Sequence, residues 1–208
     1  MNNAIIAIGA HPDDIELGCG ATLKKLAVQG TSIFTITLCN GDKGNNSHTD
    51  RLQESSLSLN SLGTTKNFFL DFKDTRLELD LDNIITSLEK ILFNISEKYN
   101  VTKIYTMYEN DRHQDHQTTY KASIIAFRSI KQIICYETPS SGVDFNPKIF
   151  EDIDESLLIS KINAIKFHKS QNHRAYMSET YLRSIATFRG QQAGYALCEA
   201  FVPYKMVL

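Results

Sequence analysis

Residues 4–30 read AIIAIGAHPDDIELGCGATLKKLAVQG, and this stretch decides the fold. Residues 4–9 form a continuous apolar run, which is typical of a strand buried on both faces of a sheet. A helical pattern of apolar residues follows at 19–29, and Gly30 ends it. The stretch therefore predicts a strand followed by a helix.

The rest of the chain repeats this alternation. Further strands are predicted at 32–38, 67–72, 102–107 and 132–136, helices at 51–62, 83–98, 115–130, 154–168 and 178–188, and a last apolar segment at 196–202. Regular alternation of strands and helices indicates a parallel sheet with helices on both faces. We expect one α/β domain over residues 1–208, with a Rossmann-like, mostly parallel sheet.

The composition limits the classes of function. The chain has 208 residues, 42% of them hydrophobic, which is enough to bury a core without disulfides or a structural metal. Its 22 basic and 24 acidic residues give a formal net charge of -2, which argues against a nucleic-acid-binding protein. We therefore expect a small-molecule partner, while a homo-oligomer stays open.

The location is predicted from two further features. The apolar stretch at 4–10 is too short for a membrane span, and no basic leader precedes it. The four cysteines are far apart and form no CxxC pair, so we expect reduced thiols. Both features predict a cytoplasmic protein.

Two polar clusters follow predicted strands. The first strand leads into HPDDIE at 11–16 and the fourth into DRHQDH at 111–116. In open α/β sheets, ligands bind beyond the carboxyl ends of the strands. A catalytic zinc takes three ligands from His, Asp or Glu and leaves one position open, and both clusters supply these residue types.

The alternative is that each cluster is a turn followed by a helix cap, with Asp115 as the cap of the helix at 115–130. That interpretation is the more common one for either cluster alone. Two clusters on the same edge of the sheet favour a shared site.

The motifs AHPDDIELGCG at 10–20 and NDRHQDH at 110–116 resemble those of the PIG-L and LmbE-like deacetylases. These are metal-dependent enzymes that remove acetyl groups from N-acetylated amino sugars. The resemblance covers nearly the whole chain. It implies a Zn²⁺ ion, although two histidines and one carboxylate also suit Fe²⁺. The implied roles are metal ligation by His11, Asp14 and His116, general base catalysis by Asp13, and oxyanion stabilisation by a protonated His113 that Asp115 orients.

Several polar residues are candidates for binding the substrate. The polar loop at 41–50 could close over a sugar as a lid. For the arginines, an exposed, solvated charge is the competing interpretation. The candidates are Arg51, Lys43, Arg112 and Gln171, with His48 and Arg174 as further members of the set.

The chain departs from the family pattern at two points. Asp111 stands where certain members have a tyrosine that assists the oxyanion, and Tyr108 is the alternative tyrosine. Ile15 separates the Asp pair from Glu16, which we interpret as structural. We interpret Cys19 and Cys39 as packing residues.

The expected function is zinc-dependent deacetylation of an N-acetylated amino sugar, whose linkage to a nucleotide, a lipid or a glycoside stays open. The first alternative is a metal-dependent amidase for another acyl amide or a thiol conjugate. The second is a nucleotide-binding module around Gly18 and Gly20. The missing third glycine of the dinucleotide motif and the acidic residues before it argue against the module.

Overall fold

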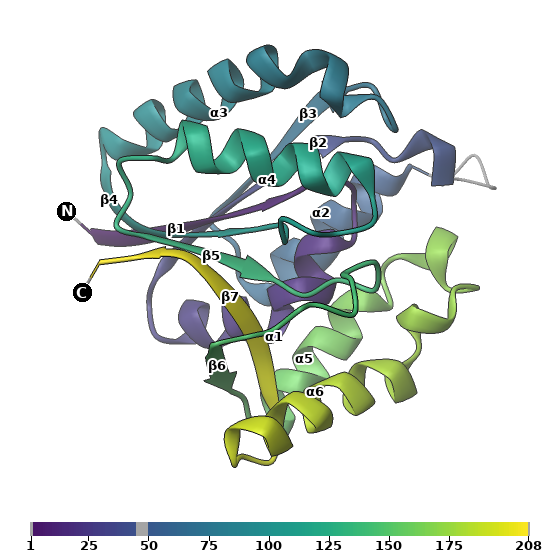
Figure 1. Ribbon diagram of the computed structural model, residues 1–208. Helices are drawn as coiled ribbons and strands as arrows, with labels where there is room; N and C mark the ends of the chain where they lie inside the picture. Colours follow the sequence, from purple (N-terminus) through teal and green to yellow (C-terminus); the bar gives the residue numbers. More distant parts are fainter. Residues whose placement is uncertain (1, 45–49, 208) are drawn as a thin grey trace.

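A seven-stranded sheet runs through the part of the chain that the computed structural model describes, residues 2–44 and 50–207 (Figure 1). The strand order is β3-β2-β1-β4-β5-β7-β6. The first five strands are parallel, and β7 pairs antiparallel with both β5 and β6. The strands are β1 (Asn2–Gly9), β2 (Ser32–Cys39), β3 (Lys66–Phe72), β4 (Tyr99–Thr106), β5 (Gln132–Tyr136), β6 (Ile149–Asp152) and β7 (Cys198–Met206).

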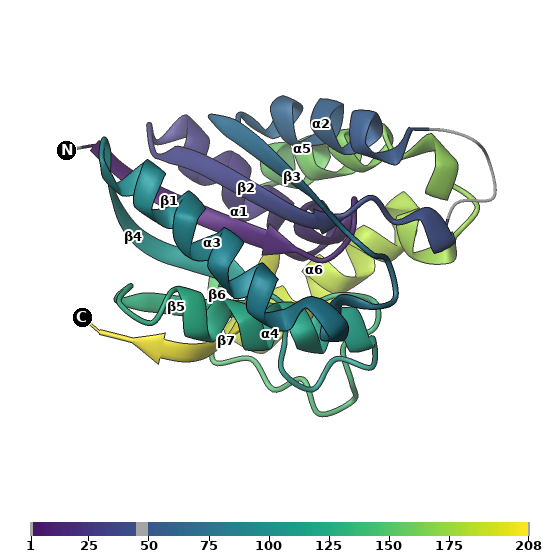
Figure 2. The same ribbon diagram turned by 90° about the horizontal axis from the view of Figure 1, so that it is seen from above.

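Helices cover both faces of this sheet, as the sequence predicts. α3 and α4 pack together on one face, while α1, α2, α5 and α6 lie on the other side (Figures 1 and 2). None of the described helices combines the length and apolar character needed to cross a bilayer. The helices are α1 (Asp14–Val28), α2 (Arg51–Leu62), α3 (Leu81–Ser96), α4 (Gln114–Ala126), α5 (Glu155–Ile165) and α6 (Glu179–Ala193).

The central strand β1 is buried on both faces of the sheet, which explains its continuous run of apolar residues. Its Ile6 and Ile8 belong to the core beneath α3 and α4, whereas Ile5 and Ala7 pack into the core on the α1 side. Each buried isoleucine stabilises the fold by about 2 kcal/mol. The four cysteines are buried and free.

The connections place a crevice at one end of β1. The chain leaves β1 for β2 and β3 on one side, then returns to β4 on the other side of β1. The direction of the connections reverses between β1 and β4, so the loops beyond these two strands diverge and leave room for a ligand. These loops carry the two polar clusters.

Two local predictions are wrong, and one strand was not predicted. α1 begins at Asp14 instead of residue 19, because a first helical turn joins the rest across a kink at Cys19 (φ -142°, ψ 20°). The N-cap of α4 is His113, whose ring accepts a hydrogen bond from the backbone N–H of Asp115, so Asp115 is not the cap. The short strand β6 was not predicted from the sequence.

Candidate active site

A cavity of about 510 Å³ lies where the β1–α1 and β4–α4 loops meet. This volume falls in the usual range for ligand sites, about 300–1,000 Å³. Most of the lining residues are polar or charged. The residues around it are His11, Asp13, Asp14, Leu17, Lys43, Gly44, Arg51, Asp74, Thr75, Arg112, His113, His116, Pro139, Ser140, Gln171, Arg174 and Tyr176.

Three side chains from the two predicted clusters converge in this cavity. Nδ1 of His11 lies 3.3 Å from Oδ2 of Asp14 and 3.3 Å from Nε2 of His116, and Nε2 of His116 lies 3.3 Å from Oδ1 of Asp14. Ligand atoms about 2.0 Å from a tetrahedral zinc would lie about 3.3 Å apart. The geometry and the donor set therefore fit a divalent transition metal.

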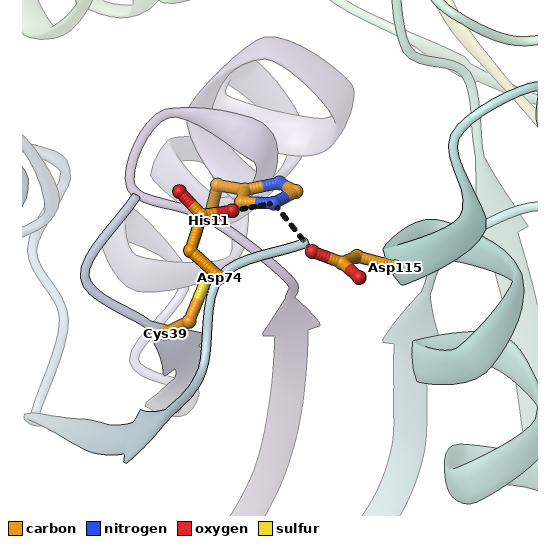
Figure 3. Close-up of side chains that lie close together, drawn as sticks. All are labelled: His11, Cys39, Asp74 and Asp115. Carbon is orange, nitrogen blue, oxygen red and sulfur yellow. Dashed lines mark hydrogen bonds and ion pairs between the residues drawn. The ribbon is translucent and has the colours of Figure 1, made fainter. Parts of the chain in front are cut away.

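The other ring nitrogen of His11 faces two carboxylates. Nε2 lies 3.2 Å from Oδ2 of Asp115 and 3.3 Å from Oδ1 of Asp74 (Figure 3). Backbone N–H groups hold both carboxylates: Thr75 and Leu77 donate to Asp115, and Lys43 donates to Asp74. A proton on Nε2 leaves Nδ1 free to bind a metal, which is the usual arrangement of a metal-binding histidine.

His116 has the same kind of support. Its Nδ1 lies 3.0 Å from Oδ2 of the fully buried Asp111 and 3.2 Å from Oγ of Ser140. Although burial disfavours the charged form, the hydrogen bond with His116 lowers the pKa of Asp111 to about 2. The Asp111 carboxylate therefore stays ionised and favours a proton on Nδ1, so that Nε2 points its lone pair at the cluster.

The three converging side chains hold opposite charges close together. Although burial opposes it, the charge of His116 keeps the pKa of Asp14 well below its usual value. In return Asp14 raises the pKa of His116 to about 9, again against the effect of burial. A dication would replace the protons on the two imidazoles, as metal binding generally does.

His11, Cys39, Asp74 and Asp115 form a second group with metal-ligating side chains (Figure 3). Its polar atoms already have protein partners, and the Cys39 thiol donates to the carbonyl of Ala10. The same His11 ring would have to serve both groups. We therefore interpret the two carboxylates of this group as supports for His11.

Asp13 adopts an unusual backbone conformation beside the cluster. Its φ of 108° lies in a region that non-glycine residues rarely occupy and that commonly marks functional sites. Its Oδ2 lies 3.3 Å from Nη2 of Arg51, which also donates to the carbonyls of Gly41 and Pro12. Burial raises the pKa of Asp13 to about 6, with Arg51 opposing the shift.

His113 lies against both other imidazoles, with ring centroids 4.7 Å from His11 and 4.7 Å from His116. Its burial and these two neighbours lower its pKa, contrary to the expectation of a protonated ring. Nδ1 accepts the backbone N–H of Asp115 at 3.2 Å, so the proton of the neutral ring resides on Nε2. The carboxylate of Asp115 contacts His11 and not His113, so the predicted pairing is corrected.

The cavity also collects the predicted substrate-binding residues. Arg51 and Gln171 are buried, and Gln171 donates to the carbonyl of Gly44. Lys43 and Arg112 are exposed at the cavity lining. His48 lies outside the described residues.

Two other residues lie away from the cavity. Tyr108 donates to the carbonyl of Asp144 and packs on Phe145, so it does not substitute for a tyrosine at position 111. Glu16 is buried and bonds to Nε2 of His168 at 2.9 Å. This placement agrees with a structural Glu16.

Sequence reasoning missed the two carboxylates Asp74 and Asp111 as supports of the imidazoles. Asp111 was noted only as a departure from the family pattern. The signal for Asp74 is its position just beyond β3, on the same edge of the sheet as the two clusters. Because the loop after β3 carries no second polar motif, the sequence does not single this residue out.

The chain is similar in sequence to known deacetylases. The profile of the family described as "PIG-L: GlcNAc-PI de-N-acetylase" matches residues 6–127. The chain is 46% identical over 167 residues to the "Uncharacterized deacetylase YaiS" of Escherichia coli K12, covering 80% of this chain and 90% of the relative. It is 28% identical over 225 residues to the diacetylchitobiose deacetylase of Thermococcus kodakarensis, covering 96% and 83%.

A solved structure has the same fold. The N,N'-diacetylchitobiose deacetylase from Pyrococcus horikoshii, complexed with its inhibitor MPG, superposes with a TM-score of 0.79 at 25% identity. The match covers 96% of this chain and 83% of that chain.

Proposed function

Because this chain belongs to the PIG-L family and is a deacetylase like its relatives, we propose that it hydrolyses the acetamide of an N-acetylated amino sugar in a Zn²⁺-dependent reaction. The observation that carries the proposal is the convergence of His11, Asp14 and His116 at 3.3 Å spacing beside Asp13 in one cavity. The sugar is inferred from the names of the family and of the diacetylchitobiose deacetylase.

We assign metal ligation to His11, Asp14 and His116. When bound, such an ion polarises the amide carbonyl and lowers the pKa of water towards neutrality. Fe²⁺ suits the same donors, so elemental analysis of protein purified without added metal decides between them.

The remaining side chains have distinct tasks in this proposal. Asp13 accepts a proton from the attacking water and delivers it to the nitrogen of the leaving amine, which is ordinary general acid-base chemistry. Arg51 holds the Asp13 carboxylate in place through its contact at 3.3 Å. His113 donates its Nε2–H to the oxygen of the carbonyl group as negative charge develops there.

The test is to incubate the zinc-loaded protein with a panel of N-acetylated compounds and to measure both released acetate and the new free amine. We expect release from N-acetylglucosamine derivatives and loss of that release in Asp13→Asn. Release only from other acyl amides or from thiol conjugates would favour the amidase alternative. No release from any compound by metal-loaded protein would contradict the proposal.

A further inference from the structure

Three cationic side chains, Lys43, Arg112 and Arg174, line the cavity around the His11, Asp14 and His116 cluster. We call these three residues the cationic rim. Within residues 2–44 and 50–207, no carboxylate lies at ion-pair distance from any of them. Their charge faces the cavity without an acidic partner in this described part of the chain.

The carboxylates of the cavity contact other groups than the side chains of the cationic rim. Asp13 pairs with Arg51, Asp14 lies between the two imidazoles, and Asp74 contacts His11. A dication bound by His11, Asp14 and His116 would leave the charge of the cationic rim unbalanced. The cavity is therefore suited to a ligand that brings negative charge with it.

The two arginines of the rim are held in position by neutral groups. Nε of Arg112 donates to the carbonyl of Ser140 at 3.2 Å, and Nε of Arg174 donates to Oε1 of Gln171 at 2.8 Å. The guanidinium of Arg174 also lies 5.8 Å from the centre of the Tyr176 ring. An arginine has five N–H donors, so each retains donors for a ligand and loses little freedom on binding it.

We propose that the substrate of this deacetylase is an N-acetyl sugar that carries a phosphate group, which the cationic rim binds while the acetamide lies at the His11, Asp14 and His116 cluster. Guanidinium groups match phosphate oxygens through paired hydrogen bonds, and a phosphate carries more charge than a carboxylate. The proposal rests on the proposed function for the sugar part. The phosphate can stand on C1, on C6 or in a nucleotide link, and all three present the same chemistry.

Binding is measured by calorimetry with the zinc-loaded Asp13→Asn variant, so that no ligand is consumed. The ligands are N-acetylglucosamine, its 1-phosphate, its 6-phosphate and UDP-N-acetylglucosamine. We expect at least one phosphorylated sugar to bind tenfold or more tightly than the neutral sugar, with the preference shrinking as salt rises. The ligand that binds most tightly identifies the position of the phosphate.

The rim is tested by adding Arg112→Gln and Arg174→Gln singly to the same background. Each should reduce the preference for the phosphorylated sugar roughly tenfold, since hydrogen bonds to charged groups are the stronger ones. Arg128→Gln is the matched control, because this arginine pairs with Glu89 on the surface and is not a lining residue of the cavity. It should leave the preference unchanged.

Two outcomes would overturn the proposal. One is equal affinity for neutral and phosphorylated sugars. The other is a preference that persists in both arginine variants but disappears in Asp14→Ala, which would place the phosphate on the metal. If binding behaves as expected but wild-type protein releases no acetate from any sugar, the proposed deacetylation fails while the anion site stands.

Discussion

Nε2 of His11 lies 3.2 Å from Oδ2 of Asp115, although 104 residues separate them in the chain. The contact joins the loop after β1 to the first turn of α4, across the point where the sheet connections reverse. It fixes which nitrogen of His11 faces Asp14 and His116. In the proposed metal site, the orientation of the ligand His11 would therefore depend on a residue outside the ligand set.

Asp115→Asn should weaken zinc binding by about 10- to 100-fold, the usual effect of losing a carboxylate that supports a metal-binding histidine. Thr75 donates to Oδ2 and Leu77 to Oδ1, so the single amide oxygen can keep only one of these two bonds. The side chain also no longer carries the charge that favours a proton on Nε2. Competition with a chromophoric chelator measures the affinity. Asp71→Asn, at an exposed position of β3, is the control, and equal affinities of the two variants would contradict the supporting role.

Asp13→Asn and Asp14→Ala should fail for different reasons. Asp13→Asn should keep its metal and lose roughly 10²-fold or more in turnover, because the proton acceptor is gone. Asp14→Ala should lose metal occupancy, and added zinc should restore part of its activity. Metal content and turnover are measured on the same preparations. If Asp13→Asn lost the metal while Asp14→Ala kept it, the two assignments would have to be exchanged.

Gly18→Ala should destabilise the fold by at least about 2 kcal/mol through overpacking. A Cβ at this position would lie 2.0 Å from Cδ2 of Tyr136, whose hydroxyl is fixed on the carbonyl of Ile8. Gly20→Ala in the same helix is the comparison, since its nearest contact would be 3.3 Å from Cγ of Lys161. Urea denaturation should show the larger loss for Gly18→Ala, and equal losses would mean that Tyr136 moves aside freely.

His168→Gln should cost more stability at pH 6 than at pH 9. Although burial alone would lower it, the charge of Glu16 raises the pKa of His168 above its usual value. A raised pKa in the folded state means that the stabilisation is complete below the unfolded value, about 6.5, and is lost as the pH rises through the folded value.

We expect His168→Gln to lose about 3 kcal/mol in the free energy of unfolding at pH 6, the usual cost of removing one partner of a buried pair. Urea denaturation of zinc-saturated protein at both pH values measures this difference. A double-mutant cycle with Glu16→Gln isolates the pair. Equal losses at pH 6 and pH 9 would show that the protonated ring does not stabilise the fold.

The sequence alone was enough to predict an α/β architecture with a mostly parallel sheet. Alternating apolar runs and helical patterns predict the parallel strands and the flanking helices, because burial on two faces requires continuous apolar strands. The strand β6 was not predicted, because its four residues, IFED, are too few to show the alternation of apolar and polar residues typical of a strand.

The sequence also determined where the functional groups gather. Polar clusters after β1 and β4 meet at one edge of a parallel sheet, so the two clusters could be predicted to share a site before any distance was known. The choice of His11, Asp14 and His116 within them came from the resemblance to the deacetylase family. The motifs around them identified the family, whose profile matches residues 6–127.

Only the tertiary structure decided which carboxylate supports which imidazole. Asp115 was expected to orient its neighbour His113, but its carboxylate contacts His11. Asp111 is the carboxylate that contacts His116. Spacing along the chain cannot reveal these pairs, because they depend on the register of β1 against β4 and on the direction of the side chains in the first turn of α4. The same holds for Asp74, which the loop after β3 brings to His11 from another part of the chain.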